Sequence, residues 1–132
     1  MIELKYKISF SDCDPAGIIF YSRVFEYCHR VYEELVNSFK LNENYWNNSE
    51  YLVPIIKASS NYIKPLKYND EIIIKLMVQN LKNSSFEFYY EIFKDNNLYV
   101  TVNTVHVFIN SVSWEKIEIP VYIKENLSKH LK

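Results

Sequence analysis

One long stretch with the periodicity of an α-helix, set between patterns of β-strands, most strongly limits the folds open to this chain. Between Ile19 and Lys40, apolar side chains recur at steps of three or four residues, and polar side chains fill the other side. A helix over this range is about 30 Å long at about 1.5 Å per residue. Its wide apolar stripe needs a whole sheet to cover it, so we predict one central helix from Ile19 to Lys40.

Nearly all of the remaining sequence shows the two-residue alternation of half-buried strands. The predicted strands are Ile2 to Phe10, Val53 to Tyr62, Ile72 to Val78, Phe86 to Ile92 and Leu98 to Ile109, with a hairpin turn at Asp95-Asn96-Asn97 and a final helix from Pro120 to Leu131. After the first strand come the helix and then four consecutive strands, which we expect to pair in chain order as an antiparallel meander. We therefore predict an α+β fold of the hotdog type, with an antiparallel sheet of five or six strands wrapped around one long central helix, as a single domain over residues 1–132.

Composition excludes several classes of function. The formal net charge of −1 provides no basic surface for nucleic acid. Aromatic residues make up 17% of the chain, and this excess predicts apolar surface left over for self-association into an oligomer. With no membrane-spanning apolar run and no leader segment, we expect a cytoplasmic protein in which Cys13 and Cys28 are free thiols. These cysteines and His29 lack the paired spacing of a zinc site, so neither a metal nor a cofactor is expected.

The only glycine, Gly17, lies in the loop that precedes the predicted helix. Glycine is used where the backbone takes a positive φ, and the preceding Asp14-Pro15 pair favours a turn. The loop therefore delivers the Asp14 carboxylate to a helix start, where backbone amides are unpaired and the helix dipole is positive. Taken alone, Asp14 is also compatible with an ordinary turn or helix-capping role, and Asp12 is expected to be a turn residue.

The run Asp12-Cys13-Asp14-Pro15-Ala16-Gly17-Ile18-Ile19-Phe20-Tyr21 resembles the active-site motif of the 4-hydroxybenzoyl-CoA thioesterase family of hotdog enzymes, including the Tol-Pal-associated acyl-CoA thioesterases. The resemblance covers nearly the whole chain, through Pro54-Ile55-Ile56, Tyr62 to Asp70, Ser85-Phe86 and Glu118-Ile119-Pro120. It implies an enzyme that hydrolyses an acyl-CoA thioester to a free acid and CoA, and that works as a homodimer or as a homotetramer formed from two such dimers.

The resemblance also implies roles for particular residues. Asp14 is the implied catalytic carboxylate, as nucleophile or as general base, and the backbone N–H of Tyr21 is the implied donor to the thioester carbonyl. Asn61 and Tyr62 are expected near Asp14 of another subunit, and Lys82 is what this chain retains of a basic cluster for the CoA phosphates. The implied substrate-binding residues are Gly17, Phe20, Asn61, Tyr62 and Lys82.

Several alternatives stay open at this point. A non-catalytic hotdog protein that binds acyl-CoA or acyl-carrier protein is the main one, although such a protein has no need of a carboxylate beside the substrate. His106 is expected to be a hydrogen-bonded histidine within a strand rather than a catalytic group. The acyl group is open among aromatic, short-chain and long-chain types. Lysines that either bind the CoA phosphates or form a solvated rim are Lys57, Lys64, Lys67 and Lys82.

Overall fold

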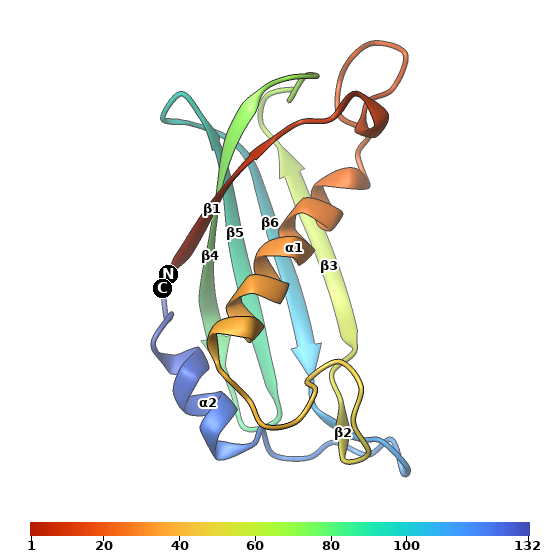
Figure 1. Ribbon diagram of the computed structural model, residues 1–132, viewed down its shortest axis with the longest axis vertical. Coiled ribbons are helices and arrows are strands. Elements are labelled where there is room, and N and C mark those ends of the chain that lie inside the picture. Colours follow the sequence, from red (N-terminus) through yellow and green to blue (C-terminus); the bar gives the residue numbers. More distant parts are fainter.

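The computed structural model describes residues 1–132. Its elements are β1 (Ile2–Lys7), a 3-10 helix (Phe10–Asp12), α1 (Arg23–Ser38), β2 (Tyr51–Leu52), β3 (Ile55–Tyr62), β4 (Glu71–Leu81), β5 (Ser85–Lys94), β6 (Asn97–Val107), β7 (Ile109–Asn110) and α2 (Val121–Ser128). Five strands form one antiparallel sheet in the order β1-β4-β5-β6-β3, and α1 runs diagonally across one face of it (Figure 1). β2 and β7 pair separately. This is the predicted α+β hotdog fold.

The core lies between α1 and the sheet, and two periodicities build it. The strands bury every second residue, and those on β4 and β5 are Ile72, Ile74, Leu76, Val78, Phe86, Phe88, Tyr90 and Ile92. α1 buries one stripe, which comprises Val24, Tyr27, Cys28, Val31, Tyr32, Leu35 and Val36. These side chains belong to one cluster of 27 buried residues, so the predicted inner faces of α1, β4 and β5 are confirmed.

β1 is shorter than the alternation of its residues predicted. It ends at Lys7 instead of Phe10, because Lys7 pairs with Glu71, the first residue of β4, and β4 offers no partner beyond it. The chain turns away after Ile8, whose N–H donates to the carbonyl of Asp70 (2.9 Å). Phe10 therefore lies in the 3-10 helix, where it is 71% exposed.

α1 begins later than predicted, at Arg23 instead of Ile19. Ile18 and Ile19 are in the loop, where they form bridges with Lys67 and Cys13 respectively. The Ile19 side chain is buried nonetheless, so an apolar residue that fits the helical period reaches the core from a loop. The C-terminal ends of both helices also precede the predicted ones, because α1 ends at Ser38 instead of Lys40 and α2 ends at Ser128 instead of Leu131.

The position of β3 is the main departure from the predicted sheet. β4, β5 and β6 form a meander, and the predicted hairpin turn has Asp95 and Asn96 at positive φ (50° and 62°). β3 does not pair with β4, which follows it, but lies at the opposite edge beside β6. The expected run of four strands paired in chain order is therefore wrong for β3, because residues 63–70 cross the end of the sheet.

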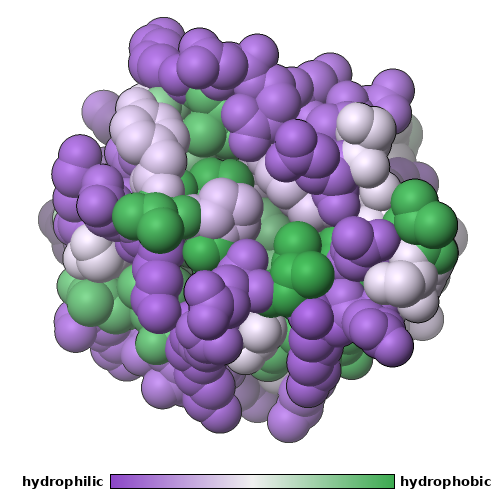
Figure 2. Space-filling view, turned by 90° about the horizontal axis from the view of Figure 1, so that it is seen from below, coloured by the Kyte–Doolittle hydropathy of each residue, from purple (hydrophilic) through white to green (hydrophobic).

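The end of the molecule that carries α2 and the β2–β7 pair has a mixed surface. Figure 2 shows hydrophobic side chains scattered among hydrophilic ones there. Exposed apolar residues here are Val121 and Tyr122 of α2 and, in the segment between β7 and α2, Val112 and Trp114. No helix of the protein is long and apolar enough to cross a membrane.

Candidate active site

The loop before α1 is a tight hairpin closed by Asp14 and Ile18. The N–H of Asp14 donates to the carbonyl of Ile18 (2.9 Å), and the N–H of Gly17 donates to the carbonyl of Asp14 (2.9 Å). This is the bonding of a three-residue hairpin loop whose last residue takes the left-handed conformation. Gly17 has a φ of 77°, and a Cβ there would meet nothing within 4 Å. Glycine is therefore required for its backbone angle rather than for space.

Backbone hydrogen bonds hold this hairpin against the segment that follows β3. The N–H of Ile19 donates to the carbonyl of Leu66 (2.8 Å), and the N–H of Tyr68 donates to the carbonyl of Gly17 (3.2 Å). Leu66 is buried, so the contact anchors the hairpin to the core. The loop is thus placed by its backbone, which leaves its polar side chains free for other contacts.

The carboxylate of Asp14 has one occupied and one unoccupied oxygen. Its Oδ1 accepts the N–H of Ala16 (2.9 Å) and, more weakly, the N–H of Ile18 (3.4 Å). Its Oδ2 has no hydrogen-bond partner in the protein, and the residue is only partly buried. Asp14 therefore serves the turn with one oxygen, as the ordinary interpretation predicts, while the other is available for chemistry.

The backbone N–H of Tyr21 has no acceptor in the protein. Its direction is fixed, because the Phe20 carbonyl of the same peptide group accepts the N–H of Arg23 (2.9 Å). Ser22 occupies the N-cap position of α1 without capping the helix through its side chain. Tyr21 precedes the helix instead of lying within it, but its amide is beside an open helix start with a positive dipole end. Such a donor is suited to an oxyanion.

Tyr62, near the end of the edge strand, contacts this helix start. Its hydroxyl donates a hydrogen bond to the carbonyl of Tyr21. Tyr62 is paired with buried Val100, which places it on the sheet face that packs against α1. The ring of Phe20 packs against that of Tyr21 with centroids 4.8 Å apart. The predicted site residues that the structure gathers in this region are Asp14, Gly17, Phe20, Tyr21 and Tyr62.

Asp12 has a role that the sequence interpretation missed. It was expected to be a turn residue, but its carboxylate is buried and its Oδ2 accepts the hydroxyl of Tyr27 on α1 (2.7 Å). The same hydroxyl accepts the N–H of Ser9 (3.1 Å), and Arg23 Nε lies 3.8 Å from Asp12 Oδ1. Burial raises the pKa of Tyr27, so its hydroxyl stays protonated and can donate. Asp12 thus joins the loop to α1. The only sequence feature that could have predicted this contact is the position of Tyr27 on the buried stripe of the helix.

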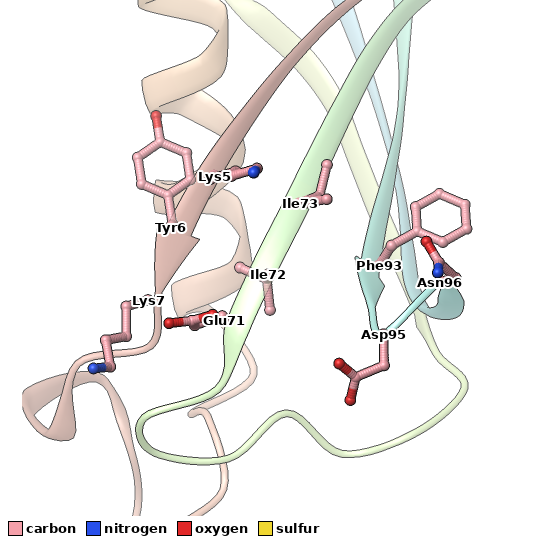
Figure 3. A pocket seen from close by; sticks show the side chains of 9 residues that line it. All are labelled: Lys5, Tyr6, Lys7, Glu71, Ile72, Ile73, Phe93, Asp95 and Asn96. Atoms are coloured by element: carbon pink, nitrogen blue, oxygen red, sulfur yellow. The ribbon is translucent and has the colours of Figure 1, made fainter.

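A cavity of about 140 Å³ lies between α1 and β3 and begins one helical turn after Tyr21. Its lining residues are Phe25, Cys28, His29, Tyr32, Ile55, Ala58, Tyr90, Thr104 and His106. A larger hollow of about 440 Å³ lies where β1, β4 and the β5–β6 turn meet, lined by charged groups of both signs such as Lys5, Glu71 and Asp95 (Figure 3). No residue of the Asp14 loop lines either hollow. The smaller one is nearer to the loop along the chain, because Phe25, in the first turn of α1, lines it.

Comparison with known proteins identifies the family. Residues 8–127 match the thioesterase-like superfamily. The chain belongs to this superfamily. A 1,4-dihydroxy-2-naphthoyl-CoA hydrolase of Nostoc punctiforme is 30% identical over 114 residues, which are 86% of this chain and 77% of that protein. The hydrolase of the same name from Crocosphaera subtropica is 32% identical over 107 residues, 78% of each chain. The structure of a 1,4-dihydroxy-2-naphthoyl-CoA thioesterase from Synechocystis matches with a TM-score of 0.87 at 21% identity, over 96% of this chain and 94% of that one.

This thioesterase-like protein is accordingly an enzyme of thioester hydrolysis. The resemblance drawn from the sequence is confirmed at the level of the superfamily. The relatives named above do not support the finer resemblance to 4-hydroxybenzoyl-CoA and Tol-Pal-associated thioesterases, because they are named for a naphthoyl-CoA.

Two predicted binding residues of this thioesterase-like protein lie apart from its hairpin. Asn61 is on the opposite face of β3 from Tyr62, and its amide bonds to the Thr101 hydroxyl (3.4 Å). Lys82 follows β4, at the end of the sheet opposite to the Asp14 hairpin (Figure 1). The structure therefore does not gather Asn61 and Lys82 with Asp14 in one chain, and the predicted roles of both require a second copy.

Proposed function

We propose that this protein hydrolyses an acyl-CoA thioester to a free acid and CoA, with Asp14 and the backbone amide of Tyr21 as the catalytic groups. The observation that carries the proposal is the unpaired, oriented N–H of Tyr21 at an uncapped helix start. It lies in the same hairpin-to-helix segment as a carboxylate with an unpartnered oxygen. Family membership supports the thioester as the bond that is cleaved.

The amide of Tyr21 polarises the substrate in this proposal. The thioester carbonyl oxygen accepts the N–H of Tyr21, and the negative charge that develops on it is stabilised by this donor and by the positive end of α1. One donor of this kind contributes about 3–4 kcal/mol to transition-state stabilisation. The peptide group does not need to reorient during the reaction, because Phe20 and Arg23 already hold it.

Asp14 acts through its unpartnered oxygen by one of two routes. As a nucleophile, Oδ2 attacks the carbonyl carbon, the C–S bond breaks to release CoA thiolate, and water then hydrolyses the mixed anhydride. As a general base, the carboxylate takes a proton from water as the water oxygen attacks, and the departing thiolate is protonated. Both routes consume one water and yield the free acid and CoA.

An aromatic acyl group fits the molecule best. The cavity that begins at Phe25, in the first turn of α1, has aromatic walls, which suit a planar ring. The relatives from Nostoc punctiforme and Crocosphaera subtropica are named for a naphthoyl-CoA, a fused aromatic thioester. We therefore propose an aryl-CoA as the substrate class, with the ring between α1 and β3 and the thioester at Tyr21.

The test is Asp14→Asn. Asparagine keeps an acceptor oxygen for the N–H of Ala16 and thus keeps the hairpin, but it loses charge and basicity. We expect kcat to fall at least about a hundredfold with binding of aryl-CoA and the melting temperature nearly unchanged. Thiol release from a panel of aryl-CoA and alkyl-CoA thioesters measures turnover.

Asp95→Asn is the matched control, because Asp95 is another turn aspartate, in a left-handed position that asparagine tolerates. Its turnover should equal that of the unmodified protein. Full turnover in Asp14→Asn would rule out the catalytic carboxylate, and a wild-type protein that releases no thiol from any member of the panel would rule out the proposed activity.

A further inference from the structure

The cavity between α1 and β3 receives two polar side chains from β6, Thr104 and His106. Val100 and Val102 occupy the preceding positions on the same face of the strand, and both are fully buried. β6 therefore carries a histidine where its own pattern calls for an apolar residue.

The ring of His106 is held rigidly in the cavity wall. The residue is 0% exposed, and its ring stacks on that of Phe86 with centroids 4.8 Å apart and an interplanar angle of 4°. The rings of Tyr32 and Phe88 contact it edge to face, at 4.9 and 4.8 Å. Its Nε2 lies 2.8 Å from the Thr104 hydroxyl, whereas its Nδ1 has no hydrogen-bond partner.

A buried nitrogen without a partner needs an explanation, because such an atom destabilises a fold. Burial lowers the pKa of His106 to about 3, so the ring is neutral near pH 7 and has one donor and one acceptor nitrogen. The Thr104 hydroxyl can donate or accept, so Nδ1 is able to take either role toward a ligand. The expectation of a fully hydrogen-bonded strand histidine is thus met at Nε2 only.

We propose that His106 is a specificity-determining residue whose Nδ1 hydrogen-bonds a hydroxyl group on the ring of an aromatic acyl substrate. The inference rests on the proposed aryl-CoA hydrolysis and narrows its substrate class to hydroxyaryl acyl groups. Aromatic walls favour the ring. The wall contains no carboxylate, lysine or arginine, and the Nδ1 of His29, which also lines it, lies 3.6 Å from the Glu33 carboxylate. An ionised substituent would therefore lose its hydration without a counter-charge of its own, whereas a neutral hydroxyl is satisfied by one nitrogen.

The test uses 2-naphthoyl-CoA and its 1-hydroxy and 1,4-dihydroxy forms. The measured quantity is the preference, defined as kcat/KM for the best hydroxylated form divided by kcat/KM for 2-naphthoyl-CoA. We expect a preference of at least about tenfold in the unmodified protein, because the unhydroxylated ring leaves Nδ1 unpaired. His106→Phe should reduce the preference to within about twofold of unity, and His106→Gln, which keeps a donor and an acceptor, should retain part of it.

Cys28→Val is the control, since Cys28 lines the same cavity and is buried. It should change kcat/KM for all three thioesters by the same factor and leave the preference intact. If His106→Phe fails to fold, Thr104→Val, which keeps the ring but removes the partner of Nε2, should lower the preference instead. If His106→Phe folds and its preference equals that of the unmodified protein, the inference is overturned. If it does not fold, an unaltered preference in Thr104→Val overturns the inference.

A binding measurement separates this inference from the proposed function. Calorimetry on Asp14→Asn gives Kd for the same three thioesters without turnover. If the protein hydrolyses none of the three thioesters, but binds the hydroxylated forms more tightly and loses this difference in Kd with His106→Phe, the proposed hydrolysis is contradicted and the role of His106 is supported. Hydrolysis with a preference independent of His106 would support the proposed function and reject this inference.

Discussion

Gly17 shapes the reactive loop through a single backbone angle. Its φ of 77° lies in the left-handed region, and the space around its Cα is open. A side chain at this position therefore meets no neighbour, and its only cost is conformational, about 1–2 kcal/mol for an ordinary L-residue. Asparagine tolerates this region, while β-branched residues do not.

Replacing Gly17 with valine or asparagine separates loop geometry from stability. We expect Gly17→Val to lower kcat at least about tenfold, because relief of strain at this residue shifts the Asp14 carboxylate relative to the Tyr21 amide. Gly17→Asn, of similar size, should keep most of the activity. Steady-state kinetics and thermal melts on both variants test this, and equal activity in the two would show that φ at this position does not matter.

His106 gives the fold a particular sensitivity to acid. Burial lowers its pKa from 6.5 to about 3, and the charge of His29 adds to the shift. The unfolded chain therefore binds this proton at a higher pH than the folded protein does, and stability is lost as the pH falls from about 6.5 toward 3. Between pH 8 and pH 5 the contribution of this one group is a loss of about 2 kcal/mol.

Substitution of His106 should remove that contribution. Urea unfolding of the wild type and of His106→Phe at both pH values gives the free energy of unfolding, and the loss on acidification should be smaller in the variant by about 2 kcal/mol. An identical loss in both proteins would mean that His106 takes up a proton as readily in the folded state as in the unfolded one.

At the scale of elements, the junction of β1, the loop and α1 depends on one tyrosine hydroxyl. Tyr27 OH donates to Asp12 and accepts the N–H of Ser9, and both bonds join the loop side to the helix. α1 can hold the hairpin in this way because Tyr27 lies on its buried stripe. The position of the hairpin relative to the helix start is therefore set by a buried polar contact as well as by apolar packing.

Removal of that hydroxyl should cost both stability and activity. In Tyr27→Phe the buried Asp12 oxygen and the Ser9 N–H lose their partner, and we expect a loss of about 1–3 kcal/mol in the free energy of unfolding together with a lower kcat. Tyr6→Phe is the control, because Tyr6 packs edge to face on Tyr27 but its hydroxyl makes no hydrogen bond. Denaturant unfolding and kinetics compare the two; similar effects would show that Asp12 does not depend on the hydroxyl.

At the scale of the whole molecule, β3 is an unpaired edge. It lies at one side of the sheet, almost all of its residues are exposed, and Ile56 is 62% exposed. An exposed edge with apolar side chains is a template for a second strand. The two edge strands of the sheet differ in exposure, because every second residue of the other edge strand, β1, is partly buried. We propose that two copies join along β3, which would place each Tyr62 and Tyr21 at a subunit boundary.

The assembly can be tested by blocking this edge. We expect light scattering to show at least a dimer, Ile56→Lys to shift the protein toward the monomer, and activity to fall with it. Val121→Lys is the control, because Val121 is 73% exposed but lies on α2, far from β3. A monomer with full turnover would contradict both the assembly and a shared site, as would equal effects of the two lysines.

Local patterns were enough to predict much of this protein. The inner faces of α1, β4 and β5 follow from periodicity, because burial of one face requires apolar residues at fixed spacing whatever the partner is. The tight turn at Gly17 follows from the properties of aspartate, proline and glycine themselves. Asp14 and Tyr21 were found by the resemblance of this short loop to a known motif, and their catalytic roles stay predictions.

Other features were decided only when distant segments came together. β1 ends at Lys7 because its partner strand β4 begins at Glu71. The residues of either strand alone do not indicate how the two strands align. β3 lies beside β6 because residues 63–70 cross the end of the sheet. The alternation of apolar and polar residues does not predict this path. The bond from Tyr27 to Asp12 and the unpaired Nδ1 of His106 likewise depend on groups far apart in the chain. The sequence by itself determined which faces are buried and where the tight turns at Gly17 and Asp95 lie, since these depend on neighbours a few residues away. The tertiary structure alone decided which buried polar atoms are satisfied, because a hydrogen bond depends on where two groups meet in space.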